Sequence, residues 1–106
     1  MAKRAHYYRL RLEYLAPASP EEPIHAPLTL DFDNHDDILQ IVDCMEACQL
    51  FATPGQASEF AIGLKLFSEV LLKNREHPLF TEFRPAFSAF MKKLKSGANS
   101  AEQTED

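Results

Sequence analysis

Four phenylalanines, spaced three, four and three residues apart, constrain this chain more than any other feature of its sequence. They are Phe80, Phe83, Phe87 and Phe90. Residues at this spacing lie on one side of a helix, so four large rings point the same way. Such a face must be covered, either by the rest of the domain or by a second copy of the chain. We therefore expect Phe80, Phe87 and Leu94 to lie in the main core.

Two segments near the N-terminus alternate between apolar and polar residues. In 6–15, HYYRLRLEYL, one side carries Tyr8, Leu10, Leu12 and Tyr14, and the other carries Tyr7, Arg9, Arg11 and Glu13. In 28–33, LTLDFD, leucine and phenylalanine alternate with threonine and aspartate. Period-two alternation predicts half-buried strands, and we expect the two to pair antiparallel. The segment 16–27 contains four prolines, which lack a donor N–H, so it is predicted to be an extended loop.

Helical patterns follow the two strands. Asn34 is the expected N-cap of a first helix that ends near Cys48, because asparagine is a favoured cap. Asp36 and Asp37 then fall in the first turn, where negative charge suits the helix dipole. A second helix is expected over 55–74. It is apolar on two sides, so it is either the central element of the domain or buried in part by another subunit.

A final helix is expected to begin near Pro85, after a short turn at 78–83, because proline is tolerated at a helix start. It should end by Ser96–Gly97, since glycine favours the C-terminal cap. Gly63 lies inside the second helix, where glycine costs about 0.5–1 kcal/mol relative to alanine. We expect it to permit a close approach between elements. The predicted fold is α+β, a two-stranded antiparallel sheet packed by three main helices in ββααα order.

A chain of 106 residues has the size of one domain. We expect that domain over 1–95 and an acidic, disordered tail over 96–106, whose composition is small and polar. The net charge of −5 becomes −2 when the three acids of the tail are removed. A nearly neutral domain lacks the field that favours nucleic acids. Because there is neither a signal peptide nor a membrane-spanning stretch, we expect a cytoplasmic protein.

Three segments of the sequence carry a likeness to a known family. They are the YYRLRLEYL strand, HAPLTLDFDNHDDILQIV at 25–42, and GLKLFSEVLLKNREHPLF through FRPAFSAFMKKLK at 63–95. Through them, residues 6–95 resemble a family of small uncharacterised bacterial proteins classed as a domain of unknown function. The resemblance implies an α+β fold. It implies no activity and no site residue, because the family has no assigned function.

The most polar cluster in the apolar C-terminal half consists of His77, Glu82 and Arg84. An imidazole suits a general base and a guanidinium suits an anion clamp, so these residues form the candidate ligand-binding site. The alternative is structural: His77 caps the turn, and Arg84 pairs with Glu82 or with a helix C-terminus. Neither a nucleophile motif nor a glycine-rich phosphate loop accompanies them, so no catalytic residue and no cofactor are assigned.

Metal-binding patterns are weak. His35, Asp36 and Asp37 place an imidazole beside two carboxylates, but neighbouring residues on a helix diverge by about 100°. Cys44 and Cys48 lie four residues apart on one helix face, without the second cysteine pair that would make a metal site convincing. We expect buried free thiols, no disulfide and no metal.

The sequence favours a non-enzymatic cytoplasmic interaction module that forms a homodimer and contacts another protein. The open sheet edges, the doubly apolar helix at 55–74 and the nearly neutral charge all favour dimerisation. Either the edge or the helix can supply the interface. Two other functions stay open: a small-ligand-binding or enzymatic domain near His77 and Arg84, and a nucleic-acid accessory protein using Arg9 and Arg11.

Overall fold

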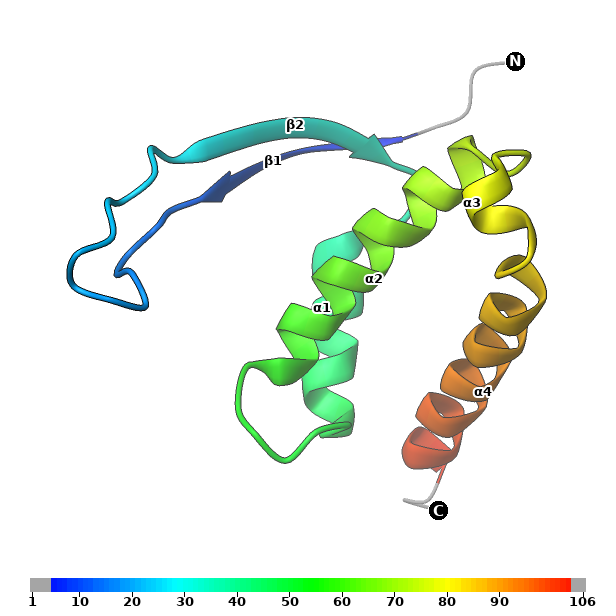
Figure 1. The fold of residues 1–106 in the computed structure, drawn as a ribbon. Helices are drawn as coiled ribbons and strands as arrows, with labels where there is room; N and C mark the ends of the chain where they lie inside the picture. Colours follow the sequence, from blue (N-terminus) through cyan, green and yellow to red (C-terminus); the bar gives the residue numbers. More distant parts are fainter. Residues whose placement is uncertain (1–4, 104–106) are drawn as a thin grey trace. The chain divides into compact units, whose positions relative to one another are not determined.

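The computed structural model describes the backbone of residues 5–103 and the side chains of residues 5–96. Its elements are β1 (His6–Leu12), β2 (Leu28–Asn34), α1 (Ile38–Cys48), α2 (Gln56–Lys73), α3 (Pro78–Thr81) and α4 (Arg84–Gln103) (Figure 1). The predicted α+β class and element order are confirmed, and the predicted turn contains the single-turn helix α3. None of the helices in the described part is long and apolar enough to cross a bilayer.

The chain divides into two compact units. Met1–Asp36 contains both strands and is called the hairpin unit below, and Asp37–Asp106 contains the helices and is called the helical unit.

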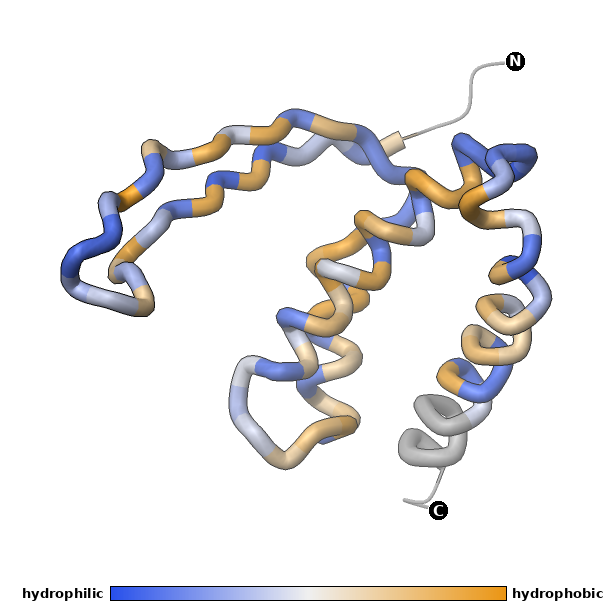
Figure 2. The backbone as a smooth tube through the Cα atoms, in the orientation of Figure 1, coloured by the Kyte–Doolittle hydropathy of each residue, from blue (hydrophilic) through white to orange (hydrophobic). Residues whose placement is uncertain are grey.

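In the hairpin unit, β1 and β2 pair antiparallel over their whole length. Side chains of one parity therefore share a face, and the hydropathy alternates along both strands (Figure 2). One face, called the apolar sheet face below, is built from three cross-strand pairs: Tyr8 with Phe32, Leu10 with Leu30, and Leu12 with Leu28. The first strand ends at Leu12, earlier than the predicted residue 15.

The opposite face of the hairpin carries its charges. The Arg9 guanidinium donates two hydrogen bonds to the Asp31 carboxylate, at 2.8 and 3.0 Å, directly across the two strands. Arg11 donates to Glu13 at 2.7 Å along β1. All four side chains are exposed, so these pairs contribute little to stability. Their arrangement gives the sheet one charged side and one apolar side.

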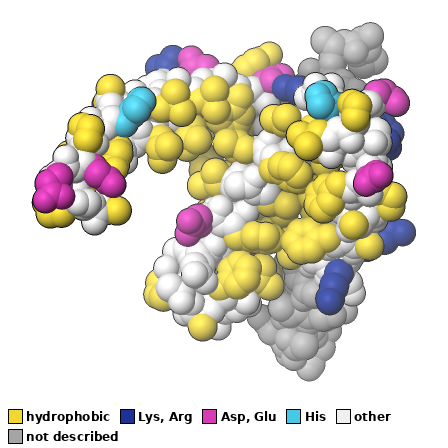
Figure 3. All heavy atoms as spheres, in the orientation of Figure 1, with side chains coloured by type: hydrophobic (Ala, Val, Ile, Leu, Met, Phe, Trp, Pro, Cys, Tyr) yellow, Lys and Arg dark blue, Asp and Glu magenta, His cyan; other side chains and the backbone are white. Residues whose placement is uncertain are grey.

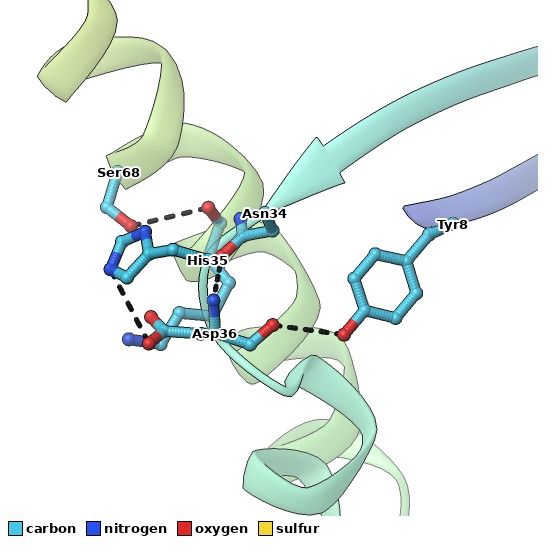
Figure 4. Close-up of polar contacts among 6 residues, drawn as sticks. Tyr8, Asn34, His35, Asp36 and Ser68 are labelled. Carbon is cyan, nitrogen blue, oxygen red and sulfur yellow. Dashed lines mark hydrogen bonds and ion pairs between the residues drawn. The ribbon is translucent and has the colours of Figure 1, made fainter. Parts of the chain in front are cut away.

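The predicted N-cap Asn34 is wrong, because this residue is the last of β2. It is only 1% exposed, and its Oδ1 accepts a hydrogen bond from the Asp36 N–H at 2.9 Å. The Tyr8 hydroxyl donates to the Asp36 carbonyl at 3.0 Å, which ties the turn to β1 (Figure 4). Asp37 caps α1 instead, accepting from the Gln40 N–H. Asparagine favours local turns as well as caps, and here the turn prevails.

In the helical unit, α2 is the central helix, as predicted. It packs against α1, and the buried apolar residues of the unit are Ile38, Ala57, Ala61, Leu64 and Leu71. The small side chains of Ala57 and Ala61 let the two helices approach closely. The first turn of α2 gains an acceptor from α1, since the Glu46 carboxylate takes hydrogen bonds from the Ser58 N–H at 3.0 Å and hydroxyl at 2.6 Å.

The phenylalanine face points toward α2, as its spacing predicts. Phe67 of α2 makes edge contacts with Phe80, Phe83 and Phe87, at centroid distances of 5.7 to 6.1 Å. The placement of Phe80, Phe87 and Leu94 in the main core is wrong, since all three are half-buried. The fully buried positions lie on α1 and α2, because alanines permit closer contact there than ring edges do.

Two helix boundaries differ from expectation at glycines. α2 begins after Gly55, whose φ of 88° only glycine adopts readily. The predicted stop at Gly97 is wrong, because α4 continues to Gln103. Residues 104–106 of the predicted tail lie outside the described residues, and the division between domain and tail stays a prediction.

The close approach expected at Gly63 is also wrong, because an added Cβ would meet no atom within 4 Å.

Replacing Gly63 with alanine should therefore stabilise the protein. The side chain enters open space, and alanine removes the helical penalty of glycine, about 0.5–1 kcal/mol. For a chain of this size, we expect thermal unfolding to rise by about 2–8 °C, measured by circular dichroism. Gly55→Ala is the matched control. Its positive φ strains any side chain, so it should lower the melting temperature, and equal effects of the two changes would contradict this account.

Replacing Arg9 with glutamine should raise the pKa of Asp31. The hydrogen bond from Arg9 lowers the pKa of Asp31 below its ordinary 3.8; desolvation opposes this, and the Arg9 charge adds to the lowering. The pair's stabilisation is thus present above 3.8 and is lost as the pH falls through the lowered pKa. NMR titration of the carboxyl carbon measures the shift. Arg11→Gln is the control and should leave the pKa of Asp31 in place; equal shifts would exclude a specific pair.

Candidate functional site

His77 lies between α2 and α3, where its side chain has a structural partner. Its Nδ1 accepts a hydrogen bond from the Leu79 N–H at 3.0 Å, which makes it the N-cap of α3. The ring also lies 6.0 Å from that of Phe80. The structural alternative predicted for His77, a cap on the turn, is confirmed. The capping bond occupies one of its two ring nitrogens.

The other two candidate ligand residues lie farther along the chain. Glu82 is the C-cap residue of α3 and is exposed, and Arg84 is the half-buried first residue of α4. A shallow hollow of about 670 Å³ next to His77 is lined by Leu72, Lys73, Asn74, Arg75, Glu76 and His77. Glu82 and Arg84 do not line it. The structure therefore does not gather the three residues around this hollow, and a ligand role for them stays a prediction.

The cysteines and His35, which formed the two weak metal-binding patterns of the sequence, have separate surroundings. Cys44 and Cys48 are both free, as predicted, but Cys44 is exposed where a buried thiol was expected. His35 lies 3.5 Å from the Asp36 carboxylate, an ion pair when the imidazole is protonated (Figure 4). Within the described residues, no group of three or more histidine, cysteine or acidic side chains could hold a metal ion.

The main exposed apolar surface of the hairpin unit is the apolar sheet face. Leu12 is 64% exposed, Leu28 54% and Leu30 44%, although the register places them side by side in one apolar row. Figure 3 shows apolar side chains gathered along one side of the hairpin. A soluble protein seldom exposes so many neighbouring leucines, and such patches mark sites of protein association. This face is therefore the leading candidate for a functional surface.

A second apolar surface lies within the helical unit. It is a shallow groove of about 410 Å³ lined by Leu50, Phe51, Phe60, Phe90, Lys93 and Leu94. Edge contacts hold its aromatic floor, with Phe51 5.4 Å and Phe90 6.3 Å from the ring of Phe60. Lys93 is the one charged residue of this lining. The groove suits an apolar segment, but its floor is continuous with the packing of α2 against α4.

Sequence reasoning identified the residues of the apolar sheet face. Their alternation was the available signal, and it indicates which face is apolar without saying what covers it. The residues chosen for chemistry were polar ones, and two of them have local structural partners: His77 caps a helix, and Asp36 belongs to the turn after β2.

Comparison with known proteins finds a matching family and a similar solved structure. The family DUF3861, a domain of unknown function with a solved structure, matches residues 6–96. A crystal structure of a protein of unknown function, eca1910 from Pectobacterium atrosepticum SCRI1043, has the same fold, with a TM-score of 0.75 and 34% sequence identity. The match covers 88% of this chain and 99% of that one. No curated protein matches the sequence.

These matches confirm the predicted resemblance to an uncharacterised bacterial family and the predicted α+β class. They extend over nearly all the described residues, both strands and the helices that follow. The family carries no assigned activity, so function has to be argued from the surfaces of the molecule. On this evidence the chain belongs to DUF3861, a family of domains of unknown function.

Proposed function

We propose that this protein is a non-enzymatic interaction module of the cytoplasm that works as a homodimer. The observation that carries the proposal is the apolar sheet face, which the hairpin unit does not itself cover: Leu12, Leu28 and Leu30 are each at least 44% exposed. Burying a leucine side chain fully is worth about 1.5–3 kcal/mol, so covering this row strongly favours association. A two-stranded hairpin is also marginal alone and gains most from being covered.

The charges of the hairpin support protein association over nucleic-acid binding. Arg9 and Arg11, the residues of the nucleic-acid alternative, pair with Asp31 and Glu13. Each acid offsets a cation that a phosphate would otherwise meet, and the whole chain carries a net charge of −5. This makes a basic nucleic-acid surface the weaker proposal.

The ligand-binding alternative near His77 is also weaker. One ring nitrogen of His77 accepts the hydrogen bond that caps α3, and neither Glu82 nor Arg84 lines the hollow beside it. The free thiols of Cys44 and Cys48 fit a reducing compartment, which supports the cytoplasmic location. The proposal therefore rests on association, with a second copy as the first partner.

Light scattering after size exclusion tests the homodimer. At micromolar concentration we expect twice the 12.0 kDa mass of one chain. The mass should persist at about 1 M salt, because an apolar interface is not weakened by screening as ion pairs are. A mass of 12.0 kDa across the concentration range would overturn the proposed dimer. A dimer that dissociates in salt would show that charges, rather than the apolar face, hold the copies together.

A further inference from the structure

We infer that a second copy of the chain docks face to face on the apolar sheet face, with a two-fold axis passing beside Leu10 and Leu30. This inference rests on the proposed homodimer and adds the surface and register that form it. It differs from both interfaces that the sequence favoured, the sheet edge and the α2 helix. Two features of the face support this arrangement: its side chains differ in size along its length, and it is hollowed at one end.

The apolar sheet face has a bulky end and a slender end. Tyr8 and Phe32 pair across the strands at one end, with ring centroids 5.6 Å apart. Leu12 and Leu28 pair at the other, and Leu10 with Leu30 stand between the two ends. A two-fold axis that runs across the strands at the middle pair lays the aromatic end of one copy over the leucine end of the other. Large residues then face small ones, the arrangement that fills space between packed layers best.

The leucine end is hollowed as well as slender. A cavity of about 530 Å³ opens there, lined by Leu12, Glu13, Tyr14, His25, Ala26 and Leu28. It is of the size that receives bulky side chains or small ligands. Under the two-fold arrangement, the paired rings of Tyr8 and Phe32 from the second copy fall over this cavity, and those of the first fall over its counterpart. Each copy thus supplies both the rings and the hollow.

Charge also favours a second copy as the occupant. None of the six residues of the apolar sheet face is charged, so two identical faces meet without repulsion. The Arg9–Asp31 pair lies on the opposite face and stays in water when the apolar faces pack. A partner with a charged surface would have to strip water from its charges for no ionic gain. Two aligned sheets pack about 10 Å apart, a distance that side chains of this size fill.

The apolar surface continues beyond the strands, which brings it toward the size a dimer needs. Tyr14 is 37% exposed, Leu15 84% and Ile24 57%, all in the loop that joins β1 to β2. A stable dimer buries about 800 Å² on each partner. The six strand residues alone form a narrow strip, so the loop residues next to the hollow are expected to complete the interface.

The first experiment compares two neighbouring residues of β2 that lie on opposite faces. Leu30→Glu puts a charge at the centre of the interface and should halve the mass measured by light scattering. Thr29→Glu, on the charged face opposite Arg11, should leave the dimer intact. Circular dichroism confirms that each variant is folded. If the wild type is a dimer and Leu30→Glu remains one, this inference is overturned and the proposed homodimer stands. If the wild type is a monomer, both fail.

Cross-linking tests the register and does not depend on a charged substitution being tolerated. In a Cys44→Ser, Cys48→Ser background, Leu30→Cys should link to its counterpart through a short bis-maleimide, whereas Thr29→Cys should not. Mixing Leu28→Cys chains with Phe32→Cys chains should give more linked dimer than either alone, because the axis brings these ends together. Equal linking at Leu30 and Thr29, or no gain on mixing, would overturn the inferred arrangement.

Discussion

The antiparallel register of β1 and β2 is the constraint from which the functional argument follows. Because Leu10 stands opposite Leu30, all the leucines of both strands fall on one face with Tyr8 and Phe32, and every arginine and aspartate of the strands falls on the other face with Tyr7. A slip by one residue would invert one strand and mix the two faces. The Arg9–Asp31 pair and the Tyr8–Phe32 contact support the same register from opposite sides of the sheet. The hairpin therefore has one apolar side and one charged side.

The helices of the helical unit pack through small side chains and through the edges of aromatic rings. Ala57 and Ala61 give α1 access to α2, while Phe67 receives the rings of α3 and α4 along their edges. Edge contacts leave much of each ring at the surface, which explains why the phenylalanine face is only half-buried. The Glu46 carboxylate satisfies the start of α2, where Gly55 has no side chain to offer. This unit therefore holds its shape by local contacts, and it leaves a shallow apolar groove open.

The sequence predicted elements better than their ends. Alternation located both strands, and the three-four-three spacing located the ring face, since both periods are properties of the backbone itself. The ends of the elements were predicted less accurately, because one side chain can take part in two different local structures. Asn34 bonds the turn after β2 instead of capping α1, and Gly97 is carried through α4 instead of ending it. Of the candidate ligand residues, His77 proved to be a cap, a role that its position before Pro78 also fits.

By itself the sequence determined the family, the α+β class, the element order and the identity of the apolar face, because each is written in periodicity or in residue type. The tertiary structure alone decided which of those apolar residues are buried. Leu64 is only 8% exposed, whereas Leu12 is 64% and Leu28 54% exposed, although all three are leucines in regular patterns. Burial depends on what packs against a face, and a one-dimensional pattern specifies the face without its partner.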